Sequence, residues 1–267
     1  MTKDQITYFE TFGFLLCRQL LAAEEVSNLA QAFDAAMVKA RRGEPRPQPG
    51  EKRQQIVPFF DYDPGSFYPL LEDDRIVDVF ETLLGPDYLF TLSEGIIHTG
   101  GTGWHHDACA PEGLFSMRAA IYLDRLGPDE GCLSVIPGSH RLEFREGVET
   151  AMAELNLEPG SVPGRYPAVN EPGDVLFMNH KLFHSAIGER PWRRAIHINC
   201  VQNASPENNR EHFDWLCKFL QGETEGWGRF YSERLIAAAG PRLRKTLDRV
   251  IDLGFGNTGP ITHLQDQ

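Results

Sequence analysis

Apolar residues recur with a helical period near both ends of the chain and with a strand-like pattern between them. Residues 4–12 are predicted to form a helix that Gly13 ends, and residues 14–21 a buried strand. A second helix is expected over residues 23–42, because its apolar side chains fall on one face. These side chains are Val26, Leu29, Ala30, Phe33 and Met37. A short helix is expected over residues 75–84.

The stretch over residues 43–55 has a different character, since it is rich in proline, glycine and charge. It predicts a long loop without secondary structure of its own. Such a loop either orders over a substrate as a lid or is a solvated connector. The sequence leaves both interpretations open.

Short β-rich runs separated by turn residues occupy residues 88–202 and predict a sandwich or barrel. Residues 141–170 interrupt this pattern as an irregular or helical insertion. Helical patterns return after the β-rich part. We therefore expect a mainly β protein with flanking helices, and one domain over residues 1–267. Its parts are a helical region over residues 1–87, the β-core, and a helical region over residues 203–267.

Composition and charge narrow the class of protein. The net charge is −12 and the pI about 5.2, which argues against nucleic acid or an anionic membrane as a partner. No apolar run is long enough to span a membrane, and the first residues lack a targeting pattern. Five cysteines without a C-x-x-C spacing argue against a disulfide framework or a zinc ribbon. A cytoplasmic protein is expected, and its oligomeric state is left open.

Candidate chemistry appears at Trp104-His105-His106-Asp107, which follows a glycine-rich turn. In an extended segment, side chains two residues apart point to the same face, so His105 and Asp107 would converge. Two imidazoles and one carboxylate form the facial triad of non-haem Fe(II) oxygenases, so one more histidine is required. His184 is the candidate, and His180 is the weaker rival. His106 is expected to point to the other face.

Arg193 follows His184 by nine residues, across a turn signalled by Glu189-Arg190-Pro191. A hairpin would place Arg193 beside His184 on the neighbouring strand. An arginine there can hold a carboxylate with two hydrogen bonds. A metal site next to such an arginine suits a 2-oxo acid that chelates iron at one end.

Several segments together resemble the phytanoyl-CoA dioxygenase family. They occur in the family's order and span most of the chain: Phe12-Gly13-Phe14, Trp104-His105-His106-Asp107, EGCLSVIPGSHR at 130–141 and GDVLFMNHKLFHSAIGERPWRRAIHINCV at 173–201. The resemblance implies a double-stranded β-helix, or jelly-roll, with Fe(II), 2-oxoglutarate and O2 as cofactor and co-substrates. Ascorbate is expected to stimulate such an enzyme.

The resemblance also implies roles for individual residues. His105, Asp107 and His184 become the metal ligands, and Arg193, rather than Arg194, becomes the clamp on 2-oxoglutarate. The implied reaction is hydroxylation of an unactivated C–H bond of a small soluble metabolite, with release of succinate and CO2. Because Asp107 keeps the metal-binding carboxylate, halogenation is not expected.

Two departures from the family pattern concern the co-substrate. Ser185-Ala186 stands where Gly-Ser is frequent after the distal histidine, and Ala120 stands where a polar or aromatic residue is common. Fewer side chains are therefore expected to contact 2-oxoglutarate here. Neither departure removes a metal ligand.

Alternation along the strands places further polar residues on the face that lines the barrel. The candidate substrate contacts are Glu94, His98, Arg118, His197 and Asn199. A buried carboxylate needs a partner. We expect Glu94 to find it either in Arg118 or in a cationic group of the substrate.

Two other functions remain open at this point. The same three residues could hold Zn²⁺ in a hydrolase or isomerase. The barrel could also be a non-catalytic metal- or ligand-binding protein. Neither alternative gives the arginine after the distal histidine a co-substrate to bind.

Overall fold

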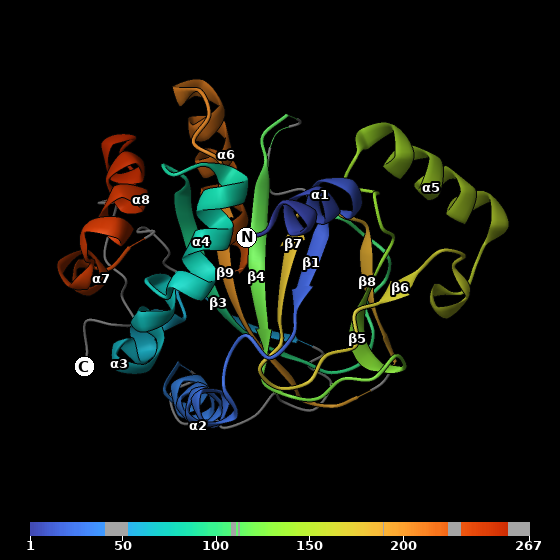
Figure 1. Ribbon diagram of the computed structural model, residues 1–267, viewed down its shortest axis with the longest axis horizontal. Helices are drawn as coiled ribbons and strands as arrows, with labels where there is room; N and C mark the ends of the chain where they lie inside the picture. Colours follow the sequence, from blue (N-terminus) through green and yellow to red (C-terminus); the bar gives the residue numbers. More distant parts are fainter. Residues whose placement is uncertain (41–52, 108–110, 112, 189, 224–230, 256–267) are drawn as a thin grey trace.

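Two antiparallel sheets form the centre of the protein (Figure 1). The structure is a computed structural model that describes residues 1–40, 53–107, 111, 113–188, 190–223 and 231–255. The strands are β1 (Phe14–Cys17), β2 (Arg53–Ile56), β3 (Leu89–His98), β4 (Ser116–Tyr122), β5 (Glu130–Val135), β6 (Tyr166–Pro167), β7 (Val175–Asn179), β8 (His184–Gly188) and β9 (Arg193–Val201).

The six-stranded sheet has the order β1-β7-β4-β9-β3-β2, and the three-stranded sheet has the order β6-β5-β8. After β4 the chain passes to the three-stranded sheet for β5 and β6, returns for β7, and crosses again for β8 and for β9, which is how a jelly-roll closes around an interior. Successive side chains of each strand point alternately into this interior and out of it. The predicted mainly β core with flanking helices is confirmed.

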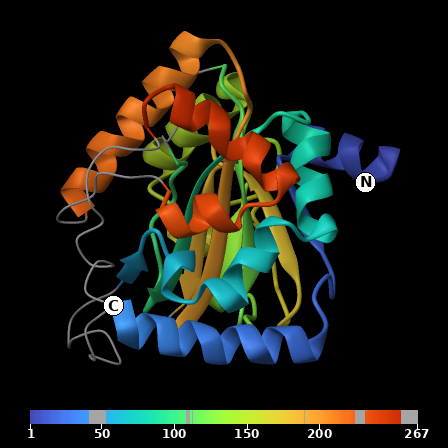
Figure 2. The same cartoon turned by 90° about the vertical axis from the view of Figure 1, so that its left-hand side faces the viewer.

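Helices cover the outer face of the six-stranded sheet (Figure 2). The helices are α1 (Lys3–Phe12), α2 (Ala23–Ala40), α3 (Pro64–Phe67), α4 (Asp74–Leu84), α5 (Leu142–Leu155), α6 (Pro206–Glu223), α7 (Glu233–Ala238) and α8 (Pro241–Asp252), with short 3₁₀ turns at Phe60–Tyr62, Tyr68–Leu71 and Pro159–Ser161. In Figure 2, α2 lies along the lower edge, while α4, α7 and α8 lie in front of the sheet.

The main hydrophobic core lies between these helices and the sheet. Ile196, Ile198 and Cys200 of β9 are buried in it together with Phe33 of α2 and Phe80 of α4. The alternation predicted for residues 193–200 is therefore confirmed. The other face of β9 is left to line the interior of the barrel.

Several element boundaries differ from the sequence-based expectations. The expected strand over residues 14–21 ends at Cys17, because Gln19 has a φ of 48° in a turn held by Asp174. Residues 53–55 of the expected loop begin β2, and the rest of that loop lies outside the described residues. The insertion over residues 141–170 is confirmed and contains α5.

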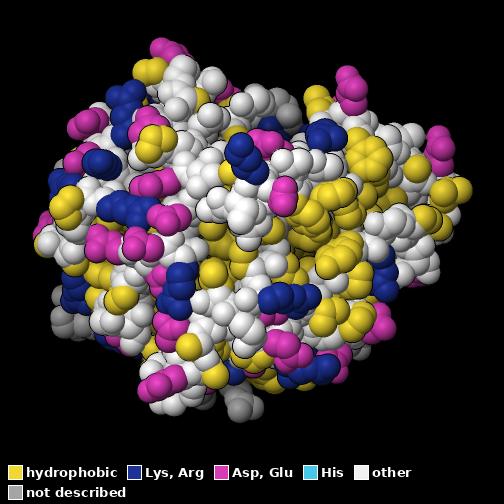
Figure 3. Space-filling view, viewed as in Figure 1, with side chains coloured by type: hydrophobic (Ala, Val, Ile, Leu, Met, Phe, Trp, Pro, Cys, Tyr) yellow, Lys and Arg dark blue, Asp and Glu magenta, His cyan; other side chains and the backbone are white. Residues whose placement is uncertain are grey.

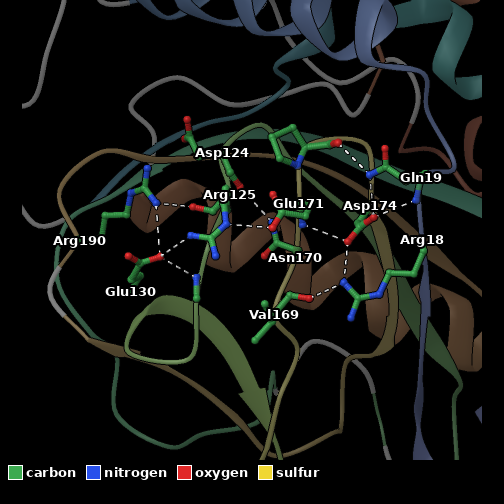
Figure 4. A network of polar contacts seen from close by, with 12 residues as sticks. Arg18, Gln19, Asp124, Arg125, Glu130, Val169, Asn170, Glu171, Asp174 and Arg190 are labelled. Atoms are coloured by element: carbon green, nitrogen blue, oxygen red, sulfur yellow. Dashed lines mark hydrogen bonds and ion pairs between the residues drawn. The ribbon is translucent and has the colours of Figure 1, made fainter.

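A polar network joins the loops at one end of the barrel (Figure 4). Arg18 bonds to Asp174 at 2.7 Å and to the carbonyl of Val169 at 2.6 Å. Arg125 pairs with Glu171 at 2.9 Å and with Glu130 at 3.7 Å. These contacts connect the turn after β1 with the loops before β5 and β7.

On the face shown in Figure 3, side chains of both charges are mixed on the left-hand side. Hydrophobic side chains gather on the right, near α1 and the three-stranded sheet. The exposed large hydrophobic residues are Tyr8, Phe12, Leu142, Phe144, Leu155 and Tyr166. Among the residues described, no helix combines the length and apolar character needed to cross a membrane.

Candidate active site

Three side chains converge inside the open end of the barrel. His105, Asp107 and His184 each offer one ligand atom, and these atoms all lie within 4.8 Å of one another. His184 opens β8, and His105 is held against it by two backbone hydrogen bonds of 3.0 and 2.8 Å. The amide of Asp107 donates to the carbonyl of His180 at 2.8 Å. The predicted convergence is present, although Asp107 lies outside the named strands.

Hydrogen bonds fix the orientation and the tautomer of the two imidazoles. Nδ1 of His105 lies 2.8 Å from the carbonyl of Gly103, and Nδ1 of His184 lies 2.7 Å from the carbonyl of Leu182. A carbonyl only accepts, so Nδ1 carries the proton in each ring and Nε2 offers its lone pair.

Burial lowers the pKa of both histidines, which favours the neutral form that binds a metal. Nε2 of His184 also lies 3.9 Å from Oδ2 of Asp107. The three residues therefore fit a divalent cation with two nitrogen ligands and one oxygen ligand.

Arg118 meets this group from β4. Its guanidinium forms an ion pair with Asp107, and its Nη1 lies 3.3 Å from Nδ1 of His197. Burial lowers the pKa of Arg118, and the nearby carboxylate of Glu94 opposes that shift. The ion pair holds the carboxylate of Asp107 at the point where the imidazoles converge.

Arg193 begins β9, next to β4 in the six-stranded sheet, and is buried, with 5% of its surface exposed. Its guanidinium donates to the carbonyls of Gly131 and Gly100. Burial lowers its pKa, and no carboxylate among the described residues pairs with it. A buried guanidinium that contacts only neutral groups is suited to bind an anionic ligand.

The expected hairpin between His184 and Arg193 is wrong. β8 pairs with β5 in the three-stranded sheet, whereas β9 pairs with β3 and β4 in the six-stranded sheet. The connection between them crosses from one sheet to the other, as the jelly-roll requires. Arg193 therefore lies opposite His98 in the strand register, on the other sheet from His184.

Arg194 points the other way, as alternation requires. It pairs with Asp124 at 2.8 Å and with Asp34 at 2.8 Å. The hydrogen bonds to Asp124 and the charge of that carboxylate raise the pKa of Arg194 despite its partial burial. Its charge is thus already matched by carboxylates outside the barrel.

Glu94 lies inside the barrel, as predicted, and is 8% exposed. Its direct partners are Gln55, His197 at 3.2 Å and Asn199 at 3.0 Å. Of the two partners that the sequence left open, Arg118 does not bond to Glu94 directly, because it pairs with Asp107. Burial raises the pKa of Glu94, but the hydrogen bonds from His197 and Asn199 and the charge of Arg118 outweigh it and lower the pKa to about 2.

Two other histidines, His98 and His180, also lie in the interior of the barrel. Burial, followed by the charges of Arg53 and Arg193, lowers the pKa of His98 to about 3, so its imidazole is neutral. His180 is bonded to Ser116 at 2.9 Å and to Asn199 at 3.0 Å, and it is not part of the metal-binding group. The preference for His184 over His180 agrees with this geometry.

A cavity of about 280 Å³ opens beside the metal-binding group. Its lining includes residues that were not singled out from the sequence, among them Arg53, Gln55, His212 and Trp215. The first two belong to β2, whose polar sequence RQQI hides its strand character, and the last two belong to α6. Alternation within RQQI was the available signal for Arg53 and Gln55, because residues two apart share a face.

A jelly-roll with two histidines and one carboxylate at its open end is the arrangement of mononuclear non-haem iron proteins. Comparison with protein families gives a match to phytanoyl-CoA dioxygenase (PhyH) over residues 9–190, and the chain belongs to this family. The family predicted from the sequence is confirmed.

Two curated relatives are ectoine dioxygenases. The protein from Bordetella bronchiseptica is 28% identical over 156 residues, which is 53% of this chain and 50% of the relative. This chain therefore spans about half the length of that relative. The protein from Sphingopyxis alaskensis is 27% identical over 242 residues, which is 76% of this chain and 77% of the relative.

Solved structures share the fold. HygX from Streptomyces hygroscopicus with nickel and 2-oxoglutarate bound has a TM-score of 0.60 at 16% identity, covering 76% of this chain and 88% of that one. EctD from S. alaskensis with bound Fe has a TM-score of 0.59 at 20% identity and covers 78% of each chain. The predicted jelly-roll is thereby confirmed.

Proposed function

We propose that this protein hydroxylates an unactivated C–H bond of a small metabolite, with 2-oxoglutarate converted to succinate and CO2. The observation that supports it most strongly is the pairing of two features across one interior. One is the convergent His105, Asp107 and His184, and the other is the buried Arg193, which has no carboxylate partner within the described part of the chain. Iron, 2-oxoglutarate and O2 together supply the oxidation of the C–H bond.

The protein's own residues hold and orient the reactants in this proposal. His105 and His184 present unprotonated Nε2 atoms to Fe(II), and Asp107 adds its carboxylate. Arg193 binds the distal carboxylate of 2-oxoglutarate with a charge-assisted hydrogen bond. His98, which is neutral and opposite Arg193 in the register, lines the same part of the interior without adding charge.

The cavity sets the size of the substrate. Its volume of about 280 Å³ lies just below the range for small-molecule sites, about 300–1,000 Å³. A small metabolite fits this space, whereas most of a coenzyme A thioester would lie outside it. The hydroxylated carbon has to lie where the cavity meets Asp107 and Arg118.

We also propose a cellular location and a domain organisation for this protein. We place the protein in the reducing cytoplasm, which suits its free Cys17, Cys132, Cys200 and Cys217. Residues 1–267 act as one domain. The net charge of −12 supports a protein that does not bind nucleic acid.

The test is turnover of the purified protein with Fe(II), ascorbate and 2-oxoglutarate, followed by O2 uptake and succinate formation. Many such enzymes form succinate slowly even without their substrate, so the assay does not require its identity. Metal analysis in parallel separates iron from zinc. A protein that retains zinc and forms no succinate would overturn the proposal in favour of a hydrolase.

A further inference from the structure

The charged groups around the cavity differ in whether they already have partners. Glu94 accepts hydrogen bonds from Gln55, His197 and Asn199, so its negative charge is stabilised without any ligand. Arg118 is paired with Asp107. A cationic substrate is therefore not needed to satisfy the carboxylate in this cavity.

Arg53 is the exception among these groups. It lies on β2 opposite His98, on the same face as Gln55, and it lines the cavity. Among the residues that the structure describes, no carboxylate lies within ion-pair distance of it. Its charge contributes to lowering the pKa of His98, His197 and Arg118, which shows that the charge acts on the interior.

The charges of the loaded site can be counted on the basis of the proposed function. Fe(II) and the two carboxylates of 2-oxoglutarate cancel. Asp107 and Glu94 cancel two of the three arginines, which are Arg53, Arg118 and Arg193. Among the groups that line the cavity or bind the co-substrate in this proposal, one positive charge is left over. Arg53, whose side chain is exposed, is the arginine of this set without a carboxylate partner, either among the described residues or from the co-substrate.

We propose that the substrate carries a single carboxylate and that Arg53 binds it. A monoanion neutralises the leftover charge, whereas an amine would add a second positive charge to the cavity. A carboxylate matches the guanidinium with two parallel hydrogen bonds, and it carries less charge than a phosphate monoester. The apolar part of the substrate then packs against Trp215 and Leu216 of α6, which line the same cavity.

This inference rests on the proposed function, and binding measurements can separate the two. The probes are valerate, cyclohexanecarboxylate and benzoate, each compared with its primary amide and with an amine of the same skeleton. Calorimetric titrations use the full chain loaded with Ni(II) and 2-oxoglutarate under nitrogen, so no turnover occurs. Binding of 2-oxoglutarate to the Ni(II) protein is titrated first.

Acids are expected to bind at least tenfold more tightly than their amides, and amines are expected not to bind. Arg53→Gln should remove the preference for acids, and Arg53→Glu should reverse it, while 2-oxoglutarate binds as before. Arg141→Gln is the matched control, because Arg141 is an exposed arginine that does not line the cavity.

Three results would overturn the inference and leave the proposed function intact: equal binding of acids and amides, tighter binding of amines, or absence of acid binding to a protein that binds 2-oxoglutarate. A weaker affinity for 2-oxoglutarate in Arg53→Gln would assign Arg53 to the co-substrate instead, which also overturns it. Failure of 2-oxoglutarate itself to bind would end both proposals.

Discussion

Arg118 and Asp107 form an ion pair between β4 and the segment that carries two of the metal-binding residues. Arg118 is 14% exposed and Asp107 25% exposed in their side chains, so the pair is shielded from water. A carboxylate that binds a metal is usually oriented by a second group behind it. Arg118 contacts Oδ2 of Asp107, the same oxygen that lies 3.9 Å from Nε2 of His184, and this contact gives it a role in orienting the carboxylate that is separate from substrate binding.

Arg118→Gln is expected to weaken divalent metal binding by about 10- to 100-fold, the usual effect of losing a group that orients a ligand. The affinity can be measured by titrating the protein with Co(II) and following the visible absorption of the bound ion. Arg194→Gln is the control, because Arg194 pairs with Asp124 and Asp34 outside the barrel. Equal metal affinity in both variants would show that the ion pair does not orient Asp107.

His184→Ala is expected to abolish succinate formation while the protein stays folded, because it removes one of three metal ligands. His180→Ala makes a useful contrast. His180 bonds to Ser116 and Asn199 in the interior, so its loss should lower the melting temperature but leave Co(II) binding in place. Full turnover by His184→Ala would refute the metal assignment, and loss of Co(II) binding only in His180→Ala would exchange the two histidines.

Arg193→Gln is expected to raise the KM for 2-oxoglutarate strongly, since losing a buried charged partner costs on the order of 2–5 kcal/mol. Arg194→Gln should leave that KM unchanged. Steady-state succinate formation at varied 2-oxoglutarate concentration measures both. If Arg194→Gln raised the KM instead, the inward and outward faces of β9 would have to be exchanged.

Glu94→Gln is expected to lower the free energy of unfolding at neutral pH by about 1–3 kcal/mol, because an amide cannot accept all the hydrogen bonds that the carboxylate accepts. The pKa of Glu94 is about 2 in the folded protein and near 4.5 in the unfolded chain. The carboxylate therefore stabilises the fold above pH 4.5, and this contribution is lost as the pH falls toward 2.

Urea unfolding of both proteins between pH 7 and pH 3 tests this pH dependence. The difference between wild type and Glu94→Gln should be constant above pH 5 and should shrink at lower pH. A difference that grows on acidification would mean that Glu94 is protonated in the folded protein.

The sequence predicted the parts of the site that depend on local spacing. His105 and Asp107 lie two residues apart, and the order of side chains along residues 193–200 follows strand alternation, so both could be read without a structure. The pairing of β8 could not, because strand partners in a jelly-roll are set by sheet closure over long sequence separations. The hairpin expected between His184 and Arg193 failed for this reason.

Residues that reach the site from a polar strand or a distant helix were also missed. Arg53 and Gln55 lie in a stretch without apolar alternation, so composition favoured a loop. Trp215 contributes to the cavity from α6, more than a hundred residues after Asp107 in the sequence. The partners of Glu94 were misjudged because Gln55 was not expected on the neighbouring strand.

The crossing of the chain between β8 and β9 places His184 on one sheet and Arg193 on the other. A molecule of 2-oxoglutarate bound by the metal at one end and by Arg193 at the other would link the two sheets at the open end of the barrel. Loading the site would then resist the opening of the barrel as a whole, beyond its local effect on side chains. Amide hydrogen exchange would be slowed together along β8 and β9, although these two strands share no hydrogen bonds.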